Sequence, residues 1–145
     1  MSLGANSEPS GPILGIDPGA VRVGVAAGDL ATRWARPIEV VDRRSVDAIA
    51  RIAQLVEELS ATRVVVGRPN GLAGRAGPAV AEQERFVADL RAALACPVEE
   101  YDERFTTVIA AQGLRVGGAG RRRRAELLDA VAAQVMLQGY LDAAR

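Results

Sequence analysis

Two neighbouring runs, ILGIDPG (residues 13–19) and VRVGVAAGD (residues 21–29), decide the fold of this chain. The first run is a short apolar strand that ends in an Asp-Pro-Gly turn. The second run alternates valines on one face with small residues on the other, which is the period-two pattern of a strand. Because so few residues separate the two runs, they predict an antiparallel hairpin.

The chain that follows adds a third strand and then alternates helices with strands. The third strand is expected at RWARPIEVVDR (33–43), with Pro37 marking an edge or a bend. The later elements are expected as a helix from an N-cap at Ser45 to Leu59, a buried strand at 63–67, a helix at about 80–95, a strand at 97–102, and helices at about 105–116 and 124–143. This order predicts an α/β fold with a five-stranded mixed sheet, in which three antiparallel strands are joined by parallel strands and helices flank both faces.

Composition limits the chemistry that the chain can perform. Its 145 residues, 49% hydrophobic and 25% charged, predict one packed domain at 13–145 behind a flexible lead-in at 1–12. One cysteine and no histidine exclude an internal disulfide, histidine-ligated zinc and a Ser-His-Asp triad. Every basic residue is arginine, so a P-loop lysine is excluded as well. No apolar run reaches the roughly 20 residues of a membrane span, and a single cysteine fits a cytoplasmic protein.

Three acids occupy unusual places. Asp17 ends an apolar strand, Glu103 follows the last strand, and Asp129 lies within the apolar run LLDAVAAQVML. An ionised carboxylate in such surroundings needs a partner. If the parallel strands point their carboxyl ends the same way, the three acids converge there. Carboxylates without histidine suit Mg²⁺ or Mn²⁺, which support phosphodiester hydrolysis.

Each of these acids also has a structural interpretation on its own. Asp17 can simply form the turn, and Glu103 can be a surface acid. Asp129 can pair with Arg124 or with an arginine of the sheet. The three acids together, at strand ends and on one helix, favour a metal site over these separate interpretations.

Several arginines are candidates for contact with the phosphates of a nucleic acid. They are Arg22, Arg68, Arg75, Arg121, Arg122, Arg123 and Arg124. For Arg22 an internal ion pair is the alternative. For the run at 121–124 the alternative is a solvated helix start, although a basic first turn is unfavourable for the helix dipole.

Four segments of the chain resemble the YqgF/RuvX family, a bacterial branch of the RNase H-like nucleases. They are GIDPGAVRVGVAAGD, VVVGRPNGLAG, DERFTTVIAA and LLDAVAAQVMLQGYL, in the family's order and spacing. The resemblance implies an RNase H-like fold and a metal-dependent nuclease, with Asp17, Glu103 and Asp129 as its acidic triad. The family has been linked to 5′-end maturation of pre-16S rRNA and, through its likeness to RuvC, to Holliday junction resolution.

The chain departs from the family pattern in segments that touch substrate rather than in the triad. Val21 stands before Arg22 where the family tends to have a lysine, and Asn70 begins NGLAG where an Asp-Gly is usual. The lysine-rich stretch before the last acid is replaced by RRRR, which keeps the charge.

The leading hypothesis is therefore an endonuclease, a hydrolase acting on pre-rRNA. Its alternatives are a Holliday junction resolvase, which needs a homodimer to make two symmetric cuts, and a non-catalytic nucleic-acid-binding module. An actin-like ATPase would need two such domains. No unambiguous dimer surface is evident. Trp34, Phe86 and Leu90 fit either the core or an interface, and the core is the favoured interpretation.

The expected mechanism places Asp17 between two divalent ions, with Glu103 and Asp129 each holding one of them. Asp102 is a possible supporting ligand outside the triad. Thr106 or Thr107 is expected to cap the next helix or to offer a hydroxyl to phosphate.

Overall fold

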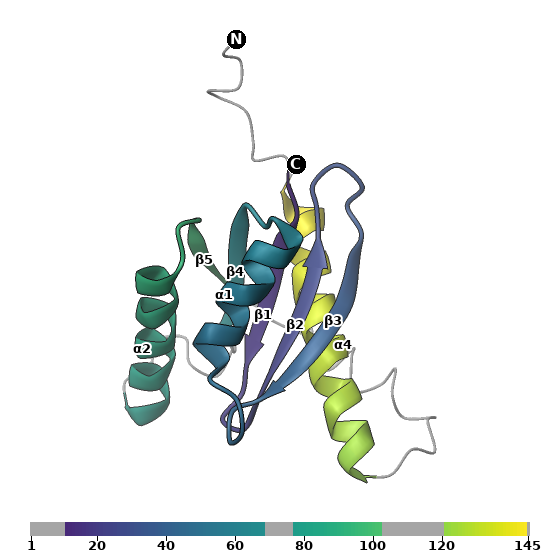
Figure 1. The fold of residues 1–145 in the computed structure, drawn as a ribbon. Helices are drawn as coiled ribbons and strands as arrows, with labels where there is room; N and C mark the ends of the chain where they lie inside the picture. Colours follow the sequence, from purple (N-terminus) through teal and green to yellow (C-terminus); the bar gives the residue numbers. More distant parts are fainter. Residues whose placement is uncertain (1–10, 69–76, 103–120, 145) are drawn as a thin grey trace.

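The computed structural model describes residues 11–68, 77–102 and 121–144, the side chains of 121–127 excepted (Figure 1). Its strands form one five-stranded sheet in the order β3-β2-β1-β4-β5. β1 pairs antiparallel with β2, and β2 with β3, whereas β1 pairs parallel with β4, and β4 with β5. The predicted mixed sheet is therefore confirmed. The strands are β1 (Ile13–Pro18), β2 (Arg22–Gly28), β3 (Ala35–Asp42), β4 (Arg63–Arg68) and β5 (Val98–Asp102).

Helices cover both faces of this sheet, as predicted (Figure 1). α1 (Ala48–Leu59) and α2 (Pro78–Ala93) pack on one face, and α4 (Arg121–Ala143) packs on the other. The alternation in β1 serves both layers, since Leu14 points into the core under α1 and α2 while Ile13 points into the core under α4. In the described parts of the chain, no helix is long and apolar enough to span a membrane.

The hairpin and the buried parallel strand form as the sequence predicts. The amide N–H of Gly19 donates to the carbonyl of Arg22 at 3.0 Å and closes the turn between β1 and β2. In the resulting register Asp17 lies opposite Gly24. On the other side of β1, the Val64–Val66 run of β4 has no exposed surface at all.

Glycines on the hairpin allow α4 to lie directly on the backbone of the sheet. A Cβ atom added at Gly24 would lie 2.2 Å from the carbonyl oxygen of Asp129 and 3.3 Å from the Cβ of Ala133. A Cβ atom at Gly15 would lie 2.8 Å from the Cβ of Leu137. No side chain fits between helix and hairpin at these points, so the glycines set the position of Asp129.

The ends of some elements differ from the expected ones for local reasons. α1 is capped by Asp47 and not by Ser45, because the Asp47 carboxylate accepts from the N–H of Ala50 at 3.2 Å. Ser45 belongs to the preceding turn, where its N–H donates to the carbonyl of Asp42. β3 begins at Ala35 because Arg33 has a left-handed backbone, with a φ of 61°.

The helix bounds also shift. α2 starts at Pro78, two residues before the expected start at 80, because proline suits the first turn of a helix. α4 starts at Arg121, so the arginine run forms its first turn. The helix expected at about 105–116 lies outside the described residues.

The interpretation of Trp34 as a core residue is wrong, whereas Phe86 and Leu90 are confirmed as core. Trp34 is 75% exposed, and Phe86 and Leu90 are 5% and 0% exposed. Trp34 lies in the connection between β2 and β3, just ahead of the edge strand, where neither helical layer covers it.

A bidentate ion pair fastens α1 to the edge strand β3. The Nε and Nη2 atoms of Arg51 donate to the two carboxylate oxygens of Glu39, both at 2.8 Å. Hydrogen bonding to Arg51 holds the pKa of Glu39 below its ordinary value, and partial burial opposes this shift.

This pair predicts a pH-dependent contribution to stability. The folded pKa of Glu39 is lowered, so the contribution is complete above the unfolded pKa of about 4.3 and is lost as pH falls through the folded pKa. We expect Glu39→Gln to lower the free energy of unfolding by about 1 kcal/mol near neutral pH. Urea unfolding over a pH series should show this difference shrinking in acid. Glu57→Gln, the same change at an exposed position of α1, is the control. A stability difference for Glu39→Gln that does not vary with pH would contradict the assignment.

The contact between Gly24 and α4 predicts a second stability effect. Gly24→Ala should destabilise the fold by about 1–3 kcal/mol, because its methyl group has to push the backbone of α4 away. Gly139→Ala is the matched control, since its Cβ would meet only the side chain of Tyr101, no closer than the ordinary distance of 3.4 Å to the hydroxyl oxygen. Within a helix that change should be neutral or stabilising by up to about 1 kcal/mol. Thermal unfolding of both variants is the measurement, and equal effects would refute the close approach.

Candidate active site

Two of the three predicted acids are brought to one place by the register of the hairpin. Asp17 lies on the face of β1 that packs on α4, in alternation with Ile13 and Gly15. Its opposite residue, Gly24, touches the backbone of Asp129. Opposed residues of an antiparallel pair have Cα atoms about 4.5–5.5 Å apart. Asp17 and Asp129 therefore approach each other at the carboxyl end of β1.

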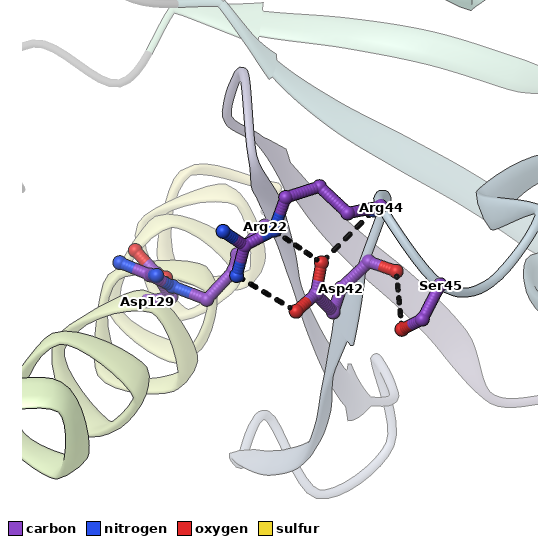
Figure 2. Close-up of polar contacts among 5 residues, drawn as sticks. All are labelled: Arg22, Asp42, Arg44, Ser45 and Asp129. Atoms are coloured by element: carbon purple, nitrogen blue, oxygen red, sulfur yellow. Dashed lines mark hydrogen bonds and ion pairs between the residues drawn. The ribbon is translucent and has the colours of Figure 1, made fainter.

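Arg22 joins these acids as an ion-pair partner. Its Nε atom lies 2.6 Å from Oδ2 of Asp129, and the two side chains are 27% and 28% exposed (Figure 2). This is the pairing with a sheet arginine that the sequence left open for Asp129. The pair is half-buried, so each group has a charged partner and both remain within reach of solvent.

Asp42 is a further acid at this end of the sheet that sequence reasoning missed. It lies opposite Arg22 in the β2–β3 register and therefore on the same face. Its oxygens accept from Nε and Nη2 of Arg44 at 3.1 and 3.0 Å, as Figure 2 shows. The signal was present in the sequence, because Asp42 ends a predicted strand in the same way that Asp17 does.

Arg68 lies at the same end of the sheet but is tied toward α2. Its Nη1 atom is 3.8 Å from Oε2 of Glu100, which also accepts from Nε2 of Gln83 at 3.3 Å. Gln83 is 7% exposed and donates to the carbonyl of Gly67 as well, at 3.3 Å. This buried amide holds the carboxyl ends of β4 and β5 together.

The remaining predicted site residues cannot be placed in the same way. Glu103, Arg75, Thr106 and Thr107 lie outside the described residues, and so do the side chains of Arg121–Arg124. Asp102 is the exposed last residue of β5. Within the described ranges, no group of three or more acidic, cysteine or histidine side chains is arranged to hold a metal ion. The acidic triad therefore remains a prediction.

The donor chemistry that the structure does bring together fits a hard divalent cation. Asp17 and Asp129 supply carboxylate oxygens, which Mg²⁺ and Mn²⁺ prefer. The Asp129 side chain is open enough, at 28% exposed, for a cation to reach it from solvent.

The comparison with known families decides which family the chain belongs to. The sequence model of the RuvX family, described as Holliday junction resolvase, matches residues 11–143. The chain belongs to the RuvX family. It is accordingly a nuclease, a hydrolase of the phosphodiester bond.

Curated relatives agree with this assignment along almost the whole chain. A protein of Chloroflexus aggregans named "Putative pre-16S rRNA nuclease" is 47% identical over 134 residues, which cover 92% of this chain and 94% of the relative. A protein of Streptomyces coelicolor with the same name is 40% identical over 153 residues, covering 100% of this chain and 92% of the relative.

Solved structures identify the fold as RNase H-like. The RuvC protein of T. thermophilus, solved in complex with a Holliday junction substrate, superposes with a TM-score of 0.53 at 21% identity, covering 86% of this chain and 90% of RuvC. A second Thermus thermophilus RuvC structure gives 0.52 at 18% identity, covering 90% and 96%. The RNase H-like fold of this RuvX chain is thus confirmed.

The buried amide of Gln83 predicts a third effect, on the ends of β4 and β5. Gln83→Leu leaves the Gly67 carbonyl and the Glu100 carboxylate without this donor, which should cost about 1–3 kcal/mol. Hydrogen exchange of the β5 amides should accelerate more than that of the β2 amides. Glu84→Leu, at the neighbouring exposed position, controls for the added apolar side chain. If β5 and β2 amides exchange faster to the same extent in both variants, Gln83 has no local role at the ends of β4 and β5.

Proposed function

We propose that this RuvX protein is a metal-dependent endonuclease that matures the 5′ end of pre-16S rRNA in the cytoplasm. Asp17, Glu103 and Asp129 are proposed to hold Mg²⁺ or Mn²⁺. The observation that carries the proposal is the contact of Gly24 with the Asp129 backbone, which brings the acid of α4 to the strand-end acid Asp17. The names of the curated relatives support pre-16S rRNA as the substrate.

In this proposal the carboxylates hold and orient the divalent cation, and the arginines bind the phosphates of the nucleic acid. A bound divalent cation supplies Lewis-acid stabilisation of the charge that develops on the phosphate. Asp17 and Asp129 fix its place from a strand and a helix, both rigid elements. Water is the attacking group, and no side chain forms a covalent intermediate. The chain has no histidine, so proton transfer through an imidazole has no part in the reaction.

The arginines around the carboxyl end of the sheet are proposed to bind the flanking phosphates. Arg22 is 27% exposed beside the acids, and Arg44 is 67% exposed at the end of β3. Arg68 is tied to Glu100 on the face toward α2, so it suits a phosphate that passes over the carboxyl end of β4. Arg75 and Arg121–Arg124 complete the proposed set.

Holliday junction resolution is the second candidate function. The description of the family model favours it, and so does the likeness to the RuvC fold. It requires a homodimer, because a junction is resolved by two symmetric cuts. A non-catalytic binding module is disfavoured, since Asp17 and Asp129 are both present and Gly24 lies opposite the one and against the backbone of the other.

Substitution of either acid predicts a loss of cleavage. Asp17→Asn and Asp129→Asn should each lower the rate by about 100-fold or more, because an amide binds a cation far less well than a carboxylate. Cleavage of labelled pre-16S rRNA and of a labelled four-way junction, both with Mn²⁺ and under one salt condition, is the measurement. The substrate that is cut faster identifies the function.

The control for this experiment is Asp142→Asn, a change of the same kind at an exposed position near the far end of α4. It should cleave at the wild-type rate. Full activity of Asp17→Asn on both substrates would remove the acids from the proposed site.

A further inference from the structure

We propose that Arg22 is a resident counter-ion of the acidic site, which competes with the divalent cation for Asp129 and moves to a substrate phosphate when nucleic acid binds. The cation and the nucleic acid then bind cooperatively. The inference rests on the proposed function, because it takes Asp17 and Asp129 as the groups that hold a cation. It goes further because it makes the Arg22–Asp129 ion pair the link between binding of the cation and binding of the nucleic acid.

The ion pair uses an oxygen that a cation needs. The guanidinium Nε lies 2.6 Å from Oδ2 of Asp129, which is the short distance of a charge-assisted hydrogen bond. A carboxylate has only two oxygens to offer. A divalent ion that binds at Asp129 must therefore either displace the guanidinium or bind close to it, where the two positive charges repel each other.

The surroundings explain why a cation is needed there before any metal arrives. Asp17, Asp42 and Asp129 all lie at one end of the sheet on the α4 side. Asp42 has Arg44 as its partner. Carboxylates gathered at one end of a sheet repel one another unless cations of this kind lie between them. Arg22 lies on the same face and neutralises the acid contributed by α4. The pair therefore holds the helix against the hairpin when no divalent ion is bound.

The Arg22 side chain can leave without disturbing the hairpin. Its backbone is fixed by pairing with Asp42 and by the 3.0 Å hydrogen bond from the N–H of Gly19 to its carbonyl. Its side chain is 27% exposed, so rotation toward solvent needs no opening of the core.

A phosphodiester offers Arg22 an alternative partner of the same charge as Asp129. A guanidinium binds phosphate oxygens in a bidentate way, with geometry that matches its planar fork. Transfer of Arg22 to the phosphate releases Oδ2 of Asp129 to a cation. Because the coupling of two binding equilibria is reciprocal, the cation must tighten nucleic-acid binding by the same factor.

Calorimetric titration of Mn²⁺ tests the competition directly and without turnover. The proteins are the wild type, Arg22→Gln, Arg22→Lys and the control Arg36→Gln, which removes the same charge from an exposed position near the start of β3. Each is titrated alone and with a phosphorothioate-substituted fragment of the pre-16S rRNA 5′ end. Arg22→Met is a second neutral variant, should circular dichroism show that Arg22→Gln does not fold.

We expect the neutral variant to bind Mn²⁺ about tenfold more tightly than the wild type in the absence of RNA. Addition of the RNA fragment should tighten Mn²⁺ binding to the wild type about tenfold and leave the neutral variant unchanged. Arg22→Lys and Arg36→Gln should follow the wild type. A purely structural ion pair would instead make the neutral variant bind Mn²⁺ more weakly.

Two results would overturn the inference in distinguishable ways. If the wild type binds Mn²⁺ and the neutral variant binds it equally well or less well, Arg22 only positions Asp129, and the proposed nuclease site stands. If neither protein binds Mn²⁺, with or without RNA, the proposed metal site fails together with the inference.

Discussion

The close approach of α4 to the β1–β2 hairpin constrains most of what this RuvX chain can do. A methyl group at Gly24 would lie only 2.2 Å from the carbonyl oxygen of Asp129, so helix and strand touch through their backbones. The side chains that normally separate a helix from a sheet are absent there. The backbone of Asp129 thereby lies against Gly24, which is opposite Asp17 near the end of β1. Arg22 lies beside this contact and forms an ion pair with Asp129.

The position of Asp129 depends on the far end of α4 as well. There Nη1 of Arg33 donates to the carbonyls of Leu141 and Ala144 at 2.7 and 2.8 Å, which satisfies the last turn of the helix. Gln138 exchanges hydrogen bonds with the backbone at the start of β3, accepting from the N–H of Ala35 and donating to the carbonyl of Arg33. A helix is stiff, so fixing its end and one contact with the hairpin positions Asp129, and the ion pair with Arg22 adds to this restraint. The left-handed backbone of Arg33 serves this purpose, because it turns the chain toward the helix end.

The sequence predicted the layers of this fold better than its charged contacts. The alternation of residues 21–29 and the β-branched run at 63–67 reflect only which side chains are buried. Burial can be predicted from the local pattern of apolar residues. The N-cap at Ser45 and the core position of Trp34 were wrong because both depend on the turns that flank β3, and turn geometry depends on the φ of single residues such as Arg33. Asp17 and Asp129 were recognised as unusual acids, yet the pairing of Asp129 with Arg22 joins residues 107 apart and requires the register of the hairpin.

The two faces of the sheet differ in role. The face under α1 and α2 forms the apolar core, and the face under α4 carries the proposed site. Under α1 and α2 the core is apolar and continuous, and the ion pair between Glu39 and Arg51 lies at its periphery, where it fastens a helix. Under α4 the apolar cluster occupies the half of the helix that lies beyond Asp129, around Met136, Leu137 and Leu141. Burial at that half contributes the packing energy that keeps like-charged groups together at the other half. Two carboxylates such as Asp17 and Asp129 repel each other, and here a buried apolar contact on the same rigid helix offsets that repulsion.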